Sequence, residues 1–176
     1  MRRALVLGIG NRMYGEDGFG SCLGEFLSKQ KLSDVEARDG DYMGMGLIGW
    51  LEGFSLVIFL DAVVDDVKED LVVYKIVPEN ATYEELAELP VDAHKASPTQ
   101  LAAFAKRSGI FDGEAYLVGL KAEKVCWPCP LTERAANLMP LAVDKVNEIL
   151  RKYGFSTFSK EGLEEWVRSN CMEIKF

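Results

Sequence analysis

The chain has 176 residues, 48% of them hydrophobic and 27% charged, a composition typical of one globular domain. Its net charge of −8 argues against nucleic acid as a partner, because phosphate binding needs a basic surface. No segment has the roughly 18 uninterrupted apolar residues that span a membrane, and the N-terminus lacks a signal-peptide pattern. We therefore expect a cytoplasmic monomer that does not insert into membranes.

In the first half of the chain, strand-like apolar runs alternate with helical patterns. Ala4–Leu7 and Val35–Ala37 predict two strands, and the apolar positions of 19–27 follow the spacing of one helical face. Met43–Leu51 predicts a short helix that its glycines weaken. Leu56–Leu60 is apolar at every position and predicts a strand in the centre of a sheet with both faces covered.

The second half of the chain adds two strands and two helices with clear starting signals. Leu71–Val77 and Ala115–Leu120 predict the strands. Residues 82–89 begin with a capping box and predict a short helix. Ser97-Pro98-Thr99-Gln100 is a stronger start, with a serine N-cap, proline at the first helical position and glutamine at the third. That helix should run to about Lys106.

Two further helices are predicted towards the C-terminus. Apolar residues at helical spacing over 135–150 indicate a long helix, which Pro140 should kink or delay in its start. Residues 159–171 predict a last short helix. The alternation of strands and helices predicts one α/β domain over 1–176, in which 155–176 is a C-terminal helical extension. We expect a mostly parallel twisted sheet with helices on both faces, as in phosphorylases and hydrolases.

Candidate site residues fall where an open α/β sheet binds ligands, beyond the carboxyl ends of its strands. Glu16 and Asp17 follow the first strand across the glycine-rich loop 8–20, Asp61 ends the most apolar strand, and His94 is the only histidine. Two carboxylates and an imidazole are suitable ligands for a divalent transition metal. The structural alternatives are a helix N-cap for Asp17, a turn cap for Asp61 and a non-ligand role for the histidine.

The glycine loop also allows a different class of function, a nucleotide-binding module. Gly8-x-Gly10 after a strand is typical of phosphate-binding loops, and Asp39 at the end of the second strand could bind a ribose. Two adjacent carboxylates beside the phosphates count against this hypothesis. The third fingerprint glycine is also missing, since its position is Met13.

Four cysteines in a chain of this length do not predict a secreted disulfide framework. Cys126-Trp127-Pro128-Cys129 is interpreted first as a surface loop. The alternative is a redox or zinc site to which Cys22 or Cys171 adds ligands.

Five motifs together resemble the hydrogenase maturation endopeptidases. The family's first motif, Gly-x-Gly-Asn, four residues, two acidic residues and Gly-x-Gly, is matched within 8–20. The others are Asp-Gly-x-x-x-Gly after the second strand, Asp-Ala ending an apolar strand, a histidine before an apolar helix, and a Gly-Leu-x-x-Glu turn. Here they are found at Asp39–Gly44, Asp61-Ala62, His94 and Gly119–Glu123. The resemblance covers about residues 3–150.

This resemblance implies an endopeptidase that removes the C-terminal extension of a NiFe-hydrogenase large-subunit precursor. Carried over by position, Asp17, Asp61 and His94 would sense the nickel of the precursor, and Glu16 is a substitute for Asp17. Zinc or cadmium is expected to replace nickel in the isolated protein. Many members carry the histidine in Ser-Pro-His-Gln, where this chain has Thr99. Others place it seven residues before a helix leucine, as His94 precedes Leu101.

Two chemical routes remain open from the sequence. The nickel could polarise the scissile carbonyl or activate a water, or a carboxylate could act as general base. No serine or cysteine nucleophile paired with a histidine is evident. A nickel-binding chaperone without catalytic activity is a further alternative.

Overall fold

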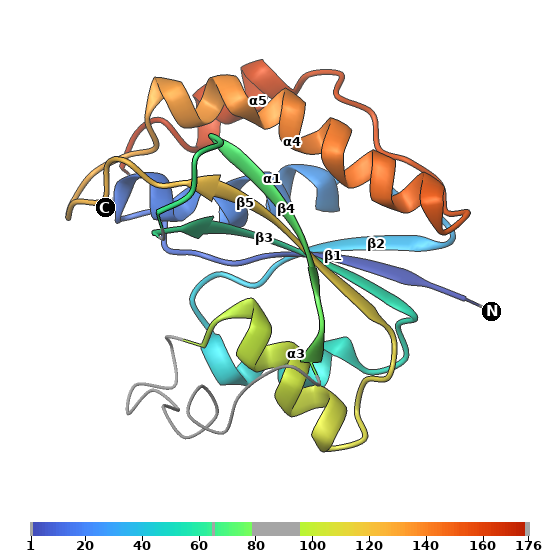
Figure 1. The fold of residues 1–176 in the computed structure, drawn as a ribbon. Helices are drawn as coiled ribbons and strands as arrows, with labels where there is room; N and C mark the ends of the chain where they lie inside the picture. The colour runs from blue at the N-terminus through green and yellow to red at the C-terminus, as the bar shows by residue number, and fades with distance from the viewer. Residues whose placement is uncertain (1, 65, 79–95, 175–176) are drawn as a thin grey trace.

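The computed structural model describes residues 2–64, 66–78 and 96–174, and Figure 1 shows their arrangement. Strands and helices alternate through most of the chain. In order, the elements are β1 (Ala4–Gly8), the 3₁₀ helix η1 (Gly15–Gly18), α1 (Phe19–Ser28), β2 (Val35–Asp39), the 3₁₀ segment η2 (Gly44–Leu51), β3 (Leu56–Val63), β4 (Leu71–Ile76), α3 (Pro98–Arg107), β5 (Glu114–Lys121), α4 (Glu133–Lys152) and α5 (Leu163–Asn170).

The strands form one five-stranded sheet in the order β2-β1-β3-β5-β4. Strands β2, β1, β3 and β5 run parallel, whereas β4 is antiparallel to β5. This confirms the predicted fold class, an α/β domain with a mostly parallel sheet. Four carboxyl ends therefore meet at one edge of the sheet, where ligands bind in such folds.

Helices cover both faces of the sheet. Figure 1 shows α1, α4 and α5 on one face and α3 with η2 on the other. Each layer encloses its own apolar cluster: Val6 and Ile58 point into the first, Leu7 and Phe59 into the second. Strand β3 is thus buried on both faces over Leu56–Leu60, as its composition predicts.

Two of three helix predictions can be compared with the structure. The capping box of α3 is confirmed, because Gln100 N–H donates to Ser97 Oγ at 3.1 Å and Ser97 N–H donates to Gln100 Oε1 at 2.9 Å. Residues 44–51 are helical, but as a 3₁₀ segment, which fits the poor α-helical propensity of glycine. The helix predicted over 82–89 lies outside the described residues.

Pro140 does not delay the start of α4. The helix begins at Glu133, capped by the Thr132 hydroxyl, which accepts from Ala135 N–H at 3.2 Å. Pro140 lies on the exposed side of the helix. Water can therefore donate to the helix carbonyl that the missing proline N–H leaves without a donor. An exposed proline is therefore tolerated inside a helix whose other face is buried.

All four cysteines are paired in two disulfides, which the sequence pattern did not predict. Cys22 on α1 is bonded to Cys171, which follows α5, and Cys126 is bonded to Cys129. The first pair lies 149 positions apart in sequence, a distance that only the fold can bridge. With every thiol in a disulfide, the alternative of a zinc site using these cysteines is wrong in this structure.

The predicted C-terminal extension packs onto the first face of the sheet. Phe155, Phe158, Leu163 and Val167 are buried in the same cluster as the residues of α1 and α4. Within the described residues, no helix has the length and apolar character needed to cross a membrane.

Candidate active site

The glycine loop brings two distant carboxylates to one edge of the sheet. Gly10 has φ 144°, and a Cβ there would lie 1.9 Å from the carbonyl oxygen of Asp17. A Cβ on Gly20 would lie 2.1 Å from the carbonyl oxygen of Leu60, which precedes Asp61 in β3. Side chains at these two positions would prevent the loop and α1 from approaching β3. Gly10 and Gly20 are therefore needed for close contact between backbone segments.

Asp17 and Asp61 line the same cleft, which has a volume of about 640 Å³. Asp17 Oδ2 accepts a hydrogen bond from Asn11 N–H at 2.9 Å, and Asp61 Oδ1 accepts from Ala62 N–H at 2.9 Å. Asp61 lies inside β3 and not at its end, because β3 pairs with β5 as far as Val63. Its side chain is therefore held by a regular strand.

The surroundings of both carboxylates oppose their ionisation. Burial, and secondarily the negative charge of Asp17, raises the pKa of Asp61 well above its ordinary value. Burial also raises the pKa of Asp17, although the hydrogen bond from Asn11 N–H acts in the opposite direction. Each pKa would fall if a cation were bound between the two groups. The cleft therefore favours a positively charged ligand.

Glu16 points away from this cleft and is 1% exposed. Its Oε1 accepts from the backbone N–H groups of Glu123 and Lys124 at 2.7 and 2.9 Å. Its Oε2 accepts from the Thr132 hydroxyl at 2.5 Å, and Arg134 donates to both oxygens at 3.2 Å. Burial raises the pKa of Glu16, but these hydrogen bonds outweigh it and leave that pKa below its ordinary value. Of the acidic pair, the residue that faces the cleft is Asp17.

His94 lies outside the described residues. The described chain resumes at Ala96, and Ala96 and Ser97 both line the cleft with Asp17 and Asp61. Within the described part of the chain, no group of three or more histidine, cysteine or acidic residues could hold a metal ion. The structure thus brings together two of the three candidate residues.

The contacts of the glycine loop do not suit a nucleotide. The backbone N–H of Asn11, in the turn after β1, is already bonded to the Asp17 carboxylate. Asp39, the candidate ribose ligand, accepts from Asp41 N–H at 2.8 Å and pairs with Arg12 at 3.3 Å. Among the described residues that line the cleft there is no lysine or arginine to bind phosphates.

No family model matches the sequence. The fold and the sequence do match solved structures. The crystal structure of a hydrogenase 2 maturation peptidase from a Thaumarchaeota archaeon is 31% identical, with a TM-score of 0.62 over 85% of this chain and 99% of that one. The chain belongs to the hydrogenase maturation endopeptidase family.

The chain is also similar to other members of this family in fold or in sequence. The hydrogenase maturating endopeptidase HybD from E. coli is 26% identical, with a TM-score of 0.66 over 86% of this chain and 94% of its own. The hydrogenase expression/formation protein HupD of Rhizobium leguminosarum bv. viciae is 25% identical over 161 residues, which cover 90% of this chain and 79% of HupD. This chain is thus a maturation peptidase by sequence and by fold.

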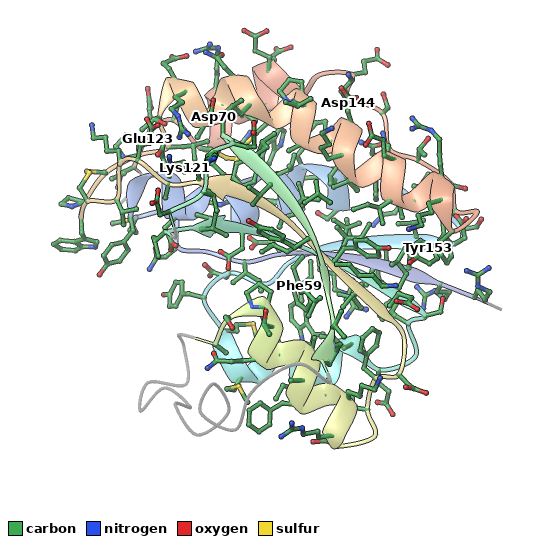
Figure 2. All side chains as sticks on the ribbon, in the orientation of Figure 1. Phe59, Asp70, Lys121, Glu123, Asp144 and Tyr153 are labelled. Atoms are coloured by element: carbon green, nitrogen blue, oxygen red, sulfur yellow. A yellow bond between two sulfur atoms is a disulfide. The ribbon has the colours of Figure 1, made fainter. Side chains whose placement is uncertain are left out.

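Several residues beside the candidate site were not predicted from the sequence. Thr132 and Arg134, at the start of α4, hold Glu16, and Arg134 also pairs with Asp70 at 3.0 Å and with Glu123 at 3.2 Å. Figure 2 shows Asp70 and Glu123 on the same side of the molecule, away from Tyr153. The only sequence signal was the Gly-Leu-x-x-Glu turn that ends at Glu123. These contacts tie the acidic loop to the segment after β5.

A second cavity, of about 650 Å³, lies at the other end of the strands. Its lining includes Arg3, Asp112 and Glu114, which form ion pairs with exposed or partly exposed partners. It is near the amino ends of the parallel strands, where α/β folds do not place their sites. The cleft at Asp17 and Asp61 is therefore the candidate active site.

Proposed function

We propose that this maturation endopeptidase removes the C-terminal extension of a nickel-loaded NiFe-hydrogenase large-subunit precursor. Asp17, Asp61 and His94 bind the nickel that the precursor already carries. The metal belongs to the substrate and marks the precursor as ready for cleavage. The chain cuts the peptide bond next to that metal centre.

The observation that carries this proposal is the pair of carboxylates in one cleft. Among the described residues, each aspartate accepts one backbone hydrogen bond, and burial raises both pKa values, so a divalent cation would relieve an unfavourable arrangement. Carboxylate and imidazole ligands suit nickel. Ala96, two residues after His94 in the chain, lines the cleft, which supports a place for the histidine in the set.

The chemistry follows from holding the substrate by its metal. Binding at the cleft would place the scissile peptide beside Asp17 and Asp61, and such proximity contributes a large part of the rate acceleration. Nickel supplies Lewis-acid polarisation of the scissile carbonyl. A carboxylate oxygen of the pair accepts the proton of the attacking water as general base.

A processing assay tests the proposal. The nickel-loaded precursor is incubated with the wild type and with Asp17→Asn, Asp61→Asn or His94→Ala, and the loss of the extension is followed by mass spectrometry. We expect each variant to lower the cleavage rate by at least about a hundredfold. Asp144→Asn on α4, which removes an exposed carboxylate paired with Lys160, should cleave as the wild type does.

Two results would contradict the proposal. Cleavage at the wild-type rate by all three site variants would exclude these residues from the reaction. Nickel-dependent binding of the precursor without any cleavage by the wild type would favour a nickel-binding chaperone. Circular dichroism of each variant shows whether the protein remains folded.

A further inference from the structure

Exposed apolar side chains lie at the cleft and in the loop that contributes to its lining. Tyr14 is 41% exposed, Val125 50% and Trp127 62%, and Tyr14 and Val125 line the cleft beside Asp17. Trp127 follows Val125 by two positions in the loop that joins β5 to α4, residues 122–132. An apolar group of this kind next to a candidate active site indicates a surface that contacts another molecule.

The 122–132 loop is held firmly against η1. Gly15 N–H donates to Cys129 O at 2.9 Å, and Cys129 N–H donates to Met13 O at 3.0 Å. Glu16 N–H donates to Lys124 O at 3.0 Å, while its carboxylate accepts from the loop as described above. The Cys126–Cys129 disulfide closes the tip of the loop between Val125 and the η1 contacts. These contacts present Trp127 in a pre-organised position.

The charges of the cleft restrict what its mouth can contact. Among the described residues that line it, the ionisable acids are Asp17 and Asp61, and there is no lysine or arginine. The described lining therefore offers an acidic residue of a bound peptide no cationic side chain to pair with. A peptide segment with apolar side chains fits the apolar rim that these exposed side chains form.

We propose that Tyr14, Val125 and Trp127 form a docking surface for an extended apolar segment of the substrate, free of acidic residues, beside the scissile bond. This inference rests on the proposed function, since it names the part of the precursor that the cleft mouth binds. Tryptophan and tyrosine supply large contact areas and dominate many interfaces. A loop already fixed in place loses little conformational entropy when it binds.

Steady-state processing and binding of the precursor test the inference together. Trp127→Ala should raise KM about tenfold, equivalent to about 1.4 kcal/mol, and leave kcat within about twofold. Leu141→Ala, which removes a 45% exposed leucine from α4, is the matched control and should change neither constant. Calorimetric titration of the same precursor into each variant should show a matching tenfold loss of affinity for Trp127→Ala.

A second pair of measurements tests the loop and the chemistry of the segment. The double variant Cys126→Ser/Cys129→Ser should raise KM in the same direction as Trp127→Ala, because the loop tip loses its closure. A synthetic peptide of the precursor's extension and the residues before the cut should inhibit processing. The same peptide with aspartates in place of its apolar residues should not.

The outcomes separate the two proposals. Wild-type cleavage with KM and affinity unchanged in Trp127→Ala would overturn the docking surface and leave the proposed function standing. Tight binding that Trp127→Ala weakens, without cleavage by the wild type, would overturn the function and support the surface. If the wild type neither binds nor cleaves the precursor, both proposals are overturned.

Discussion

Glu16 and Asp17 are chain neighbours with opposite roles. Glu16 is buried among donors that lower its pKa, whereas burial raises the pKa of Asp17, which faces the cleft. Groups whose pKa values are pushed apart by their surroundings commonly divide structural and chemical roles between them. In this pair, Glu16 stabilises the loop as an ionised carboxylate, and Asp17 is the residue available to a ligand.

The raised pKa of Asp61 predicts a stability cost that depends on pH. In the folded protein the ionised form is disfavoured, so the cost is absent at low pH and appears as pH rises through the raised pKa. We expect Asp61→Asn to be more stable than the wild type at pH 8, by about 1 kcal/mol or about 3 °C in Tm. The difference should vanish below about pH 4, where aspartate is protonated in both states.

Thermal unfolding of both proteins between pH 4 and pH 8 measures this difference. Asp144→Asn serves as the control, because its carboxylate is partly exposed on α4 and paired with Lys160. A stabilisation of Asp61→Asn that is the same at every pH would exclude the ionised carboxylate as its cause.

At the scale of elements, η1 and the 122–132 loop behave as one unit. Glu16 accepts from Glu123 N–H, Lys124 N–H and Thr132 Oγ, and Arg134 at the start of α4 completes the set. Its carboxylate therefore joins the segment after β1 to the segment after β5, which are neither strands nor neighbours in sequence. The position of Asp17 depends on this junction.

Glu16→Ala should destabilise the protein by about 3 kcal/mol, because it leaves several buried donors without an acceptor. Glu16→Gln keeps one acceptor oxygen and should lose less. Since the pKa of Glu16 is lowered, its stabilisation is present at neutral pH and is lost as pH falls through that lowered pKa.

Urea unfolding at pH 7 compares these variants. Glu148→Ala on α4 is the control, as it removes an exposed glutamate and should change stability by less than about 0.5 kcal/mol. Equal losses for Glu16→Ala and Glu148→Ala would show that the junction contributes nothing.

For the whole molecule, the Cys22–Cys171 disulfide joins the first helix to the end of the last one. Both cysteines are buried in the cluster that also contains residues of α4. Because they lie 149 positions apart in sequence, the bond closes almost the entire chain into one loop. Cys126–Cys129 closes only a short one. Closing a long loop removes more entropy from the unfolded chain than closing a short loop.

The double variant Cys22→Ala/Cys171→Ala should therefore lose about 2–5 kcal/mol of unfolding free energy, and Cys126→Ala/Cys129→Ala about 2 kcal/mol or less. Urea unfolding without reductant gives both values. A larger loss for the short loop would contradict the entropic explanation. In mild reductant, alkylation should reach Cys126 and Cys129 first, since both are partly exposed.

Much of the fold was determined by local sequence patterns. An apolar run such as Leu56–Leu60 predicts a strand, because a strand that is buried on both faces needs apolar residues at every position. The Ser97–Gln100 capping box involves only four neighbouring residues and is equally local. The order of these elements is sufficient for a mostly parallel sheet, and with it the edge where Asp17 and Asp61 lie. The positions of the strands could therefore predict that Asp61 and one acid of the Glu16-Asp17 pair meet at this edge.

Only the tertiary structure decided which acid of the loop faces the cleft. Thr132 Oγ, which binds Glu16, lies 116 positions away in sequence, and no local pattern specifies such a contact. No local pattern specifies the pairing of Cys22 with Cys171 either, nor the continuation of β3 past Asp61. Each depends on segments that meet only when the sheet and its two helical layers assemble, because hydrogen bonds and disulfides depend on proximity in space.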